Sequence, residues 1–166
     1  MKNYHYNKRV EIAEMLSDVE MVMAIDPALR KKGTGVAVCS RKYGMEVFPG
    51  MGIAEAFHMA VINEKRYNKF TLLCEYPRTK KSFGGKNGDH TVSVNIGIGL
   101  GAMRIVYELA IEFGIYVVPL YPKDTGLSQS EFREKTGYTG RTGKDGRCAG
   151  MMIYNYLKGS ATVAAV

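Results

Sequence analysis

Residues 20–40 read EMVMAIDPALRKKGTGVAVCS, and this stretch decides the fold class. It holds two short apolar runs, at 20–26 and 34–40, with a basic turn between them. Runs of this length, bounded by turn residues, are typical of buried strands. Because the turn is short, we expect the two strands to form an antiparallel hairpin, and residues 44–48 to add a third antiparallel strand.

The rest of the chain alternates helical and strand patterns, which predicts an α/β sheet that begins antiparallel and becomes parallel, flanked by helices. Pro49-Gly50 is expected to punctuate the chain after the third strand. The Ala/Val-rich tail after Leu157 is expected to be frayed. The further elements that we expect are helices at 8–17, 52–63, 92–113, 128–135 and 144–157, and strands at 69–75 and 115–120.

Length and charge narrow the class of protein. The chain has 166 residues, of which 46% are hydrophobic, so we expect one globular domain over residues 1–166. It carries 23 Lys and Arg against 16 Asp and Glu, a formal net charge of +7. An excess of positive charge raises the local concentration of polyanions, so nucleic acid is a more suitable partner than a neutral metabolite.

The cysteines and the apolar runs exclude other classes. The three cysteines, Cys39, Cys74 and Cys148, have no C-x-x-C spacing, which argues against a disulfide framework and a zinc site and favours reduced, buried thiols. No apolar run reaches the roughly 18 to 20 residues that cross a bilayer. The polar N-terminus has no signal-peptide pattern. We therefore expect a soluble, cytoplasmic protein without a membrane partner.

Acidic residues follow two of the predicted strands directly. Asp26 ends the run at 20–26, and Glu75 ends the run at 69–75. The carboxyl ends of strands line the site crevice of an open α/β sheet, and a carboxylate beside a core is costly unless it is paired or bound to a cation. Asp145 begins the last predicted helix and can reach the same crevice. Three such oxygen ligands suit Mg²⁺ or Mn²⁺, the ions that support phosphoryl displacement.

Each of these acids also has an ordinary structural explanation. Asp145 at a helix N-terminus can be a cap. Asp26 before a proline can be a turn residue, and Glu75 can be a charge at the rim of the sheet. Their joint occurrence in this order, in a basic chain, favours the metal site.

Three short motifs occur in order along the chain. They are Ile25-Asp26-Pro27 followed by TGVAV at 34–38, LCEYP at 73–77, and DGRCA at 145–149, which aligns with a closing D-x-x-D-A pattern. Together they resemble the motifs of RuvC-type Holliday-junction resolvases, members of the RNase H-like superfamily. The resemblance spans residues 21–157, and the compact size is similar to that of bacteriophage members.

This resemblance implies an RNase H-like fold and a homodimeric, Mg²⁺-dependent or Mn²⁺-dependent endonuclease that nicks two strands of a four-way DNA junction. Asp26, Glu75 and Asp145 would be its metal ligands and catalytic residues. If the chain is phage-encoded, it would work in the host cytoplasm.

The chain departs from the family pattern in three places. Ala28 stands where the family usually has Gly, and the loop before Thr34 is slightly longer. Cys148 occupies the position of the final acid, and a neutral thiol is a poor ligand for Mg²⁺. The candidates to replace that acid are Asp89, His90 and Asp124.

Three basic clusters are predicted to contact DNA phosphates. Two of them follow Asp26 and Glu75 directly, so they would flank the site and steer phosphate toward it. Phe83 lies in a Gly-rich loop between basic stretches; it can stack on an unpaired base at a junction centre, or the segment can be a plain mobile loop. The predicted contact residues are Arg30, Lys31, Lys32, Arg78, Lys80, Lys81, Phe83, Lys86 and Lys123.

Three functions therefore remain open. The leading one is a structure-selective, divalent-metal-dependent endonuclease of branched DNA. A second keeps the fold and acts on RNA or RNA–DNA hybrids, because specificity depends on loops rather than on the fold. A third is a catalytically impaired junction-binding protein, which the neutral Cys148 favours.

Overall fold

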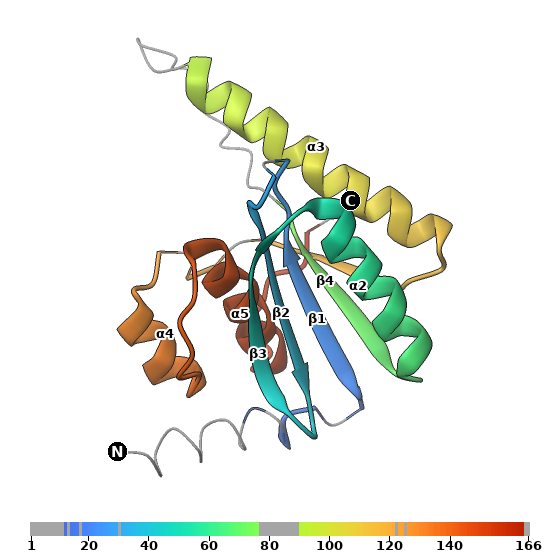
Figure 1. Cartoon of the computed structure of the whole chain (residues 1–166), viewed down its shortest axis with the longest axis vertical. Coiled ribbons are helices and arrows are strands. Elements are labelled where there is room, and N and C mark those ends of the chain that lie inside the picture. Colours follow the sequence, from blue (N-terminus) through green and yellow to red (C-terminus); the bar gives the residue numbers. More distant parts are fainter. Residues whose placement is uncertain are drawn as a thin grey trace.

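The computed structural model of the chain describes residues 12, 14–16, 18–29, 31–76, 90–121, 123–124 and 126–164, with the backbone alone for residues 90–97. Its elements, shown in Figure 1, are β1 (Met21–Asp26), β2 (Thr34–Ser40), β3 (Gly44–Met51), α2 (Ile53–Arg66), β4 (Phe70–Glu75), α3 (His90–Glu112), β5 (Val117–Leu120), α4 (Gln129–Thr136) and α5 (Lys144–Leu157).

The five strands form one mixed sheet in the order β3-β2-β1-β4-β5. β1 pairs with β2, and β2 with β3, in antiparallel fashion, whereas β4 is parallel to both β1 and β5. The predicted architecture is confirmed: an α/β sheet that begins antiparallel, becomes parallel and is flanked by helices.

The central strand β1 is buried on both faces, which explains its continuous apolar run. Val22 and Ala24 point to the face covered by α5, while Met23 and Ile25 point to the face covered by α2 and α3. Figure 1 shows α5 on one side of the sheet and α2 on the other. The next residue in this alternation is Asp26, which therefore belongs to the α5 face.

Pro49 and Gly50 lie inside β3, so the expectation that they punctuate the chain there is wrong. A proline cannot donate to a strand ladder, and it is tolerated in β3 because that strand is at the edge of the sheet. The pairing of β2 with β3 also shifts register between Thr34 and Val36. A Pro-Gly pair in the sequence does not tell an edge strand from a turn.

The expectation of a frayed C-terminal tail is also wrong. Val163 bridges Leu120 in antiparallel fashion, and the Ala164 N–H donates to the Pro119 carbonyl at 2.9 Å. The Tyr121 N–H donates to the carbonyl of Thr162 at 2.9 Å. The tail thus pairs with the outer edge of β5. Without the tail, the backbone groups on that edge of the strand would have no partner strand.

Other expectations concern the cysteines, the termini and the membrane. Cys39, Cys74 and Cys148 are buried thiols outside any disulfide, as predicted. Most of the expected helix at 8–17 falls outside the described residues. Among the helices of the part that the structure describes, none is long and apolar enough to cross a membrane.

Candidate active site

β1 and β4 deliver two carboxyl groups to the same edge and the same face of the sheet. Their parallel pairing runs up to Ile25 opposite Cys74, so Asp26 and Glu75 are the next residues on adjacent strands. Ile25 and Cys74 pack on the α2 and α3 side. Because successive side chains of a strand alternate faces, Asp26 and Glu75 both point toward α5.

The start of α5 is pressed directly against this edge. Gly35 of β2 is the antiparallel partner of Asp26, and a Cβ atom on Gly35 would overlap the backbone carbonyl of Asp145. A Cβ atom on Gly146 would lie 2.8 Å from Cγ1 of Val47. Two glycines therefore permit the helix to approach the sheet closely enough for Asp145 and Cys148 to reach Asp26.

Hydrogen bonds hold the loop that leads into α5. The side-chain amide of Gln129 donates to the Gly140 carbonyl at 2.9 Å, and its oxygen accepts from the Thr142 hydroxyl at 2.6 Å. Arg147 donates through Nε to the Leu127 carbonyl at 2.9 Å and through Nη1 to the Thr142 carbonyl at 2.9 Å. These bonds tie the start of α5, and with it the backbone of Asp145, to the α4 helix and the loop that follows it.

The loop after Asp26 is closed by a buried threonine. The hydroxyl of Thr34 donates to the Ala28 carbonyl at 3.0 Å and accepts from the Ala28 N–H at 3.2 Å. Thr34 is fully buried. This pair of bonds ties the first residues after β1 to the start of β2 and limits the freedom of the backbone at Asp26.

The side chains of this edge form a hydrogen-bonded chain. The Cys148 thiol bonds to the Asp26 carboxyl group, and Asp26 in turn bonds to Glu75. Burial, and then the charges of Glu75 and Asp145, raise the pKa of Asp26 to about 8. Burial and then Asp145 raise the pKa of Glu75, while its bond from Asp26 acts in the opposite direction. At neutral pH Asp26 is therefore largely protonated, and its carboxyl group donates to Glu75.

The two nearby thiols stay protonated. Burial, and then the charges of Asp26, Glu75 and Asp145, raise the pKa of Cys148 to about 12. Burial and the same Glu75 and Asp26 also raise the pKa of Cys74, whose thiol lies 3.9 Å from the Glu75 carbonyl oxygen. Cys148 is thus a hydrogen-bond donor to Asp26 and not a fourth negative charge. We call Asp26, Glu75, Asp145 and Cys148 the acidic cluster.

The structure brings together the three acids that the sequence singled out. It does not preform a metal cage: among the described residues, no three His, Cys, Asp or Glu side chains are already arranged to hold an ion. What it shows is a pair of carboxyl groups in contact with a third in electrostatic range. Such carboxyl groups share a proton, because two adjacent negative charges cannot both persist at the edge of a core.

Of the candidates to replace the missing acid, only the side chain of Asp124 is described. Asp124 has a positive φ of 59° and accepts from Lys135 Nζ at 3.2 Å, so its carboxylate already has a cationic partner. Only the backbone of His90 is described, and Asp89 lies outside the described residues.

Three of the predicted DNA contacts lie among the described residues. Lys31 and Lys32 are exposed in the loop that joins β1 to β2. Lys123 follows β5 and donates through Nζ to the Ser160 carbonyl at 3.2 Å, so it also contacts the C-terminal tail. The remaining predicted contacts lie outside the described residues: Arg30, Arg78, Lys80, Lys81, Phe83 and Lys86.

Sequence reasoning missed the groups that position the acids. Gly35 and Thr34 were noted only as part of a motif, and the signal for their role is the Thr-Gly pair directly after a basic turn. Cys148 was expected to weaken the site by lacking a charge. Its hydrogen bond to Asp26 could not be read from the sequence, because it depends on how closely α5 approaches β1.

Comparison with known proteins gives a limited result. No protein-family model matches the chain, and no curated protein matches it either. Among solved structures, RuvC from T. thermophilus in complex with a Holliday junction substrate aligns with a TM-score of 0.46 and 16% identity, covering 87% of this chain and 99% of that chain. A second structure of Thermus thermophilus RuvC aligns with a TM-score of 0.39 and 15% identity over the same shares. These scores describe a loose likeness of the backbone path, which says nothing about the chemistry of the site.

Proposed function

We propose that the protein is a divalent-metal-dependent endonuclease that nicks branched DNA such as four-way junctions. The observation that carries this proposal is the convergence of Asp26, Glu75 and Asp145, from three separate elements, at the carboxyl edge of the sheet. A structural role alone does not account for the cluster, because it places carboxyl groups against one another where burial raises their pKa values.

The donor set fits a hard cation. Carboxylate oxygens are the ligands that Mg²⁺ and Mn²⁺ take in proteins. Asp26, Glu75 and Asp145 would hold the ion, and its charge would offset the repulsion that now keeps a proton on Asp26. When bound, such an ion stabilises the negative charge that develops on a phosphate during in-line displacement.

The chain's own residues have distinct tasks in this scheme. Asp26 and Glu75 give up their shared proton and present oxygens on one side of the edge. Asp145, fixed by the Gly35 contact, closes the cluster from the helix side. Lys31 and Lys32 attract phosphate to an edge that would otherwise repel it. Cys148 orients the Asp26 carboxyl group through its thiol hydrogen bond.

The proposal of branched DNA as the substrate rests on the sequence motifs. They resemble those of RuvC-type junction resolvases, so we propose a four-way junction as substrate and a homodimer as the working form. A junction with two-fold symmetry is matched by a dimer that presents two acidic clusters, one to each of the strands to be nicked. The basic clusters would position the arms without reading their sequence.

A second candidate function rests on Cys148. Its neutral thiol lies against Asp26 and contributes no charge, so the cluster has three carboxyl groups where the family motif has four. A protein that binds junctions but holds metal too weakly to cleave them would have such a site.

A cleavage panel separates these functions. The full-length protein is incubated with Mg²⁺ or Mn²⁺ and with a four-way junction, a fork, a duplex, an RNA–DNA hybrid and a single strand. We expect paired nicks in the junction, and none when EDTA replaces the metal. Preference for the hybrid would contradict the DNA-junction assignment. Tight junction binding without cleavage in either metal would favour the impaired binder.

A further inference from the structure

The opposite end of the sheet carries a groove that the nuclease proposal does not use. Two adjoining hollows of about 330 and 410 Å³ share four lining residues, Ser40, Tyr43, Arg66 and Tyr67. They lie at the end of β1 where Met21 begins the strand, whereas Asp26 ends it. Five residue steps of about 3.3 Å separate these ends, a span of about 17 Å. The groove is therefore distinct from the acidic cluster.

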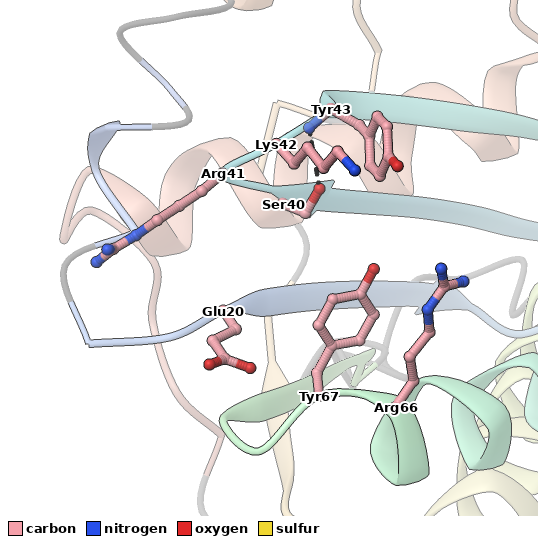
Figure 2. A pocket seen from close by; sticks show the side chains of 7 residues that line it. All are labelled: Glu20, Ser40, Arg41, Lys42, Tyr43, Arg66 and Tyr67. Atoms are coloured by element: carbon pink, nitrogen blue, oxygen red, sulfur yellow. Dashed lines mark hydrogen bonds between the residues drawn. The ribbon is translucent and has the colours of Figure 1, made fainter.

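Two similar tripeptides form the walls of this groove. Arg41-Lys42-Tyr43 follows β2, and Lys65-Arg66-Tyr67 ends α2; of the second tripeptide, Arg66 and Tyr67 line the groove. Figure 2 shows the Tyr43 and Tyr67 rings on opposite sides of the pocket. Lys42 Nζ lies 5.0 Å from the centre of the Tyr43 ring, and the Arg66 guanidinium carbon lies 5.8 Å from that of Tyr67. Each wall therefore pairs an aromatic ring with a cation.

The floor of the groove is apolar and largely buried. Met21, Val38 and Phe48 line it from three neighbouring strands, on the face of the sheet that α2 covers only in part. Tyr43 is 51% exposed, so part of its ring surface faces solvent beside Lys42. Two cations, Lys42 and Arg66, lie beside the two rings, and the lining also holds two carboxylates, Glu20 and Glu46. Arg41 extends away from the groove in Figure 2, and its Nε donates to the Leu16 carbonyl at 2.7 Å.

We propose that this groove binds a short segment of single-stranded nucleic acid, with bases stacked on Tyr43 and Tyr67 and phosphates held by Lys42 and Arg66. A nucleotide combines a flat base with a phosphate, and each wall of the groove combines a flat ring with a cation. Stacking on aromatic rings beside a basic groove is the usual mode of sequence-tolerant single-strand binding. An acidic peptide would satisfy the cations but would offer no flat group to the rings. The single-strand binding does not depend on the proposed nuclease activity.

The test measures binding of a fluorescein-labelled ten-nucleotide oligo-dT to the full-length protein by anisotropy, in EDTA, over a series of salt concentrations. We expect Tyr43→Ala and Arg66→Ala each to weaken binding about tenfold, and Tyr43→Phe to retain it within twofold. Arg66→Ala should also reduce the slope of log K against log[salt] by about 1.

Two matched controls keep the result specific. Tyr116→Ala removes another exposed tyrosine (69% exposed), and Arg104→Ala removes an exposed arginine on α3; both should leave oligo binding unchanged within twofold. Equal losses in these controls, or no loss in Tyr43→Ala and Arg66→Ala, would overturn the proposal. So would a polyglutamate peptide that binds in a Tyr43-dependent way where oligo-dT does not. If the oligo binds as expected but no junction is cleaved, the groove stands and the nuclease proposal fails.

Discussion

The two ends of β1 have opposite chemistry. At its carboxyl end, Asp26 lies among partly buried carboxyl groups, and burial and like charge raise its pKa to about 8. At its amino end, the groove of Lys42, Tyr43, Arg66 and Tyr67 presents cations and rings that water already solvates. The comparison shows that the carboxyl end of β1 costs more folding free energy than its amino end. Buried charges of one sign need a proton or a cation between them, whereas exposed cations are stable alone and gain only modestly from a ligand.

The largest expected effect is the loss of cleavage when an acid of the cluster is neutralised. Asp26→Asn or Glu75→Gln should lower the rate of junction nicking about 10³-fold or more, because several kcal/mol of charge stabilisation by the ion are lost. Binding of oligo-dT should change by less than twofold. The exposed acids Asp18 and Glu55 provide the matched controls Asp18→Asn and Glu55→Gln. Retained nicking in Asp26→Asn would place the chemistry elsewhere.

Gly35→Ala tests the contact that positions Asp145. Because the new Cβ would overlap backbone atoms of Asp145, which cannot rotate away, we expect the free energy of unfolding to fall by about 3 kcal/mol. Chemical denaturation measures this change. Gly101→Ala is the control: nothing lies within 4 Å of its Cβ position in α3, so it should be neutral or stabilise the protein by up to about 1 kcal/mol. Similar midpoints for the two variants would show that α5 does not depend on Gly35.

The pH dependence of the free energy of unfolding measures how the raised pKa of Asp26 affects stability. The pKa of Asp26 is higher in the folded protein, about 8, than in the unfolded chain, so protonation favours folding. In metal-free protein this contribution is fully present below about pH 4 and is lost as the pH rises toward 8. Over this pH range, we expect the free energy of unfolding to decline by at least about 2 kcal/mol less in Asp26→Asn than in the native protein. Urea unfolding at each pH measures this difference. Parallel profiles for the variant and the native protein would contradict the raised pKa.

The variant Cys148→Asp tests the position of the final acid in the motif, because it adds the negative charge that Cys148 lacks. We expect Mg²⁺ to bind about tenfold more tightly by calorimetry, which corresponds to about 1.4 kcal/mol, because a hard carboxylate oxygen replaces a thiol. The metal-free variant should be less stable than the native protein, since it adds one more like charge. Cys148→Ser, which stays neutral, serves as the control and should leave Mg²⁺ affinity within twofold. Weaker Mg²⁺ binding in Cys148→Asp would show that the thiol is the better partner.

The sequence was sufficient for the strands and for the adjacency of two acids. The strand at 34–40 and the helix at 144–157 have the predicted bounds, because apolar runs and their flanking residues carry that information locally. Asp26 and Glu75 were expected to be neighbours because each ends a buried run, and the register of β1 with β4 makes them so.

The groove and the Cys148 bond were not predictable in the same way. Tyr43 and Tyr67 lie on separate elements, and only the sheet order and the position of α2 bring them to one pocket. The bond of Cys148 to Asp26 depends on two glycine contacts that let α5 approach the sheet. Both features come from packing between distant segments, which no local pattern records.

The most direct test of the central claim is to locate a bound metal ion. Metal-free crystals are soaked in Mn²⁺, and the anomalous signal of manganese identifies each site. We predict a peak about 2.0 to 2.2 Å from carboxylate oxygens of Asp26, Glu75 and Asp145, with none in crystals of Asp26→Asn soaked in the same way. A peak remote from these three side chains, or no peak at saturating Mn²⁺, would contradict the metal-dependent nuclease.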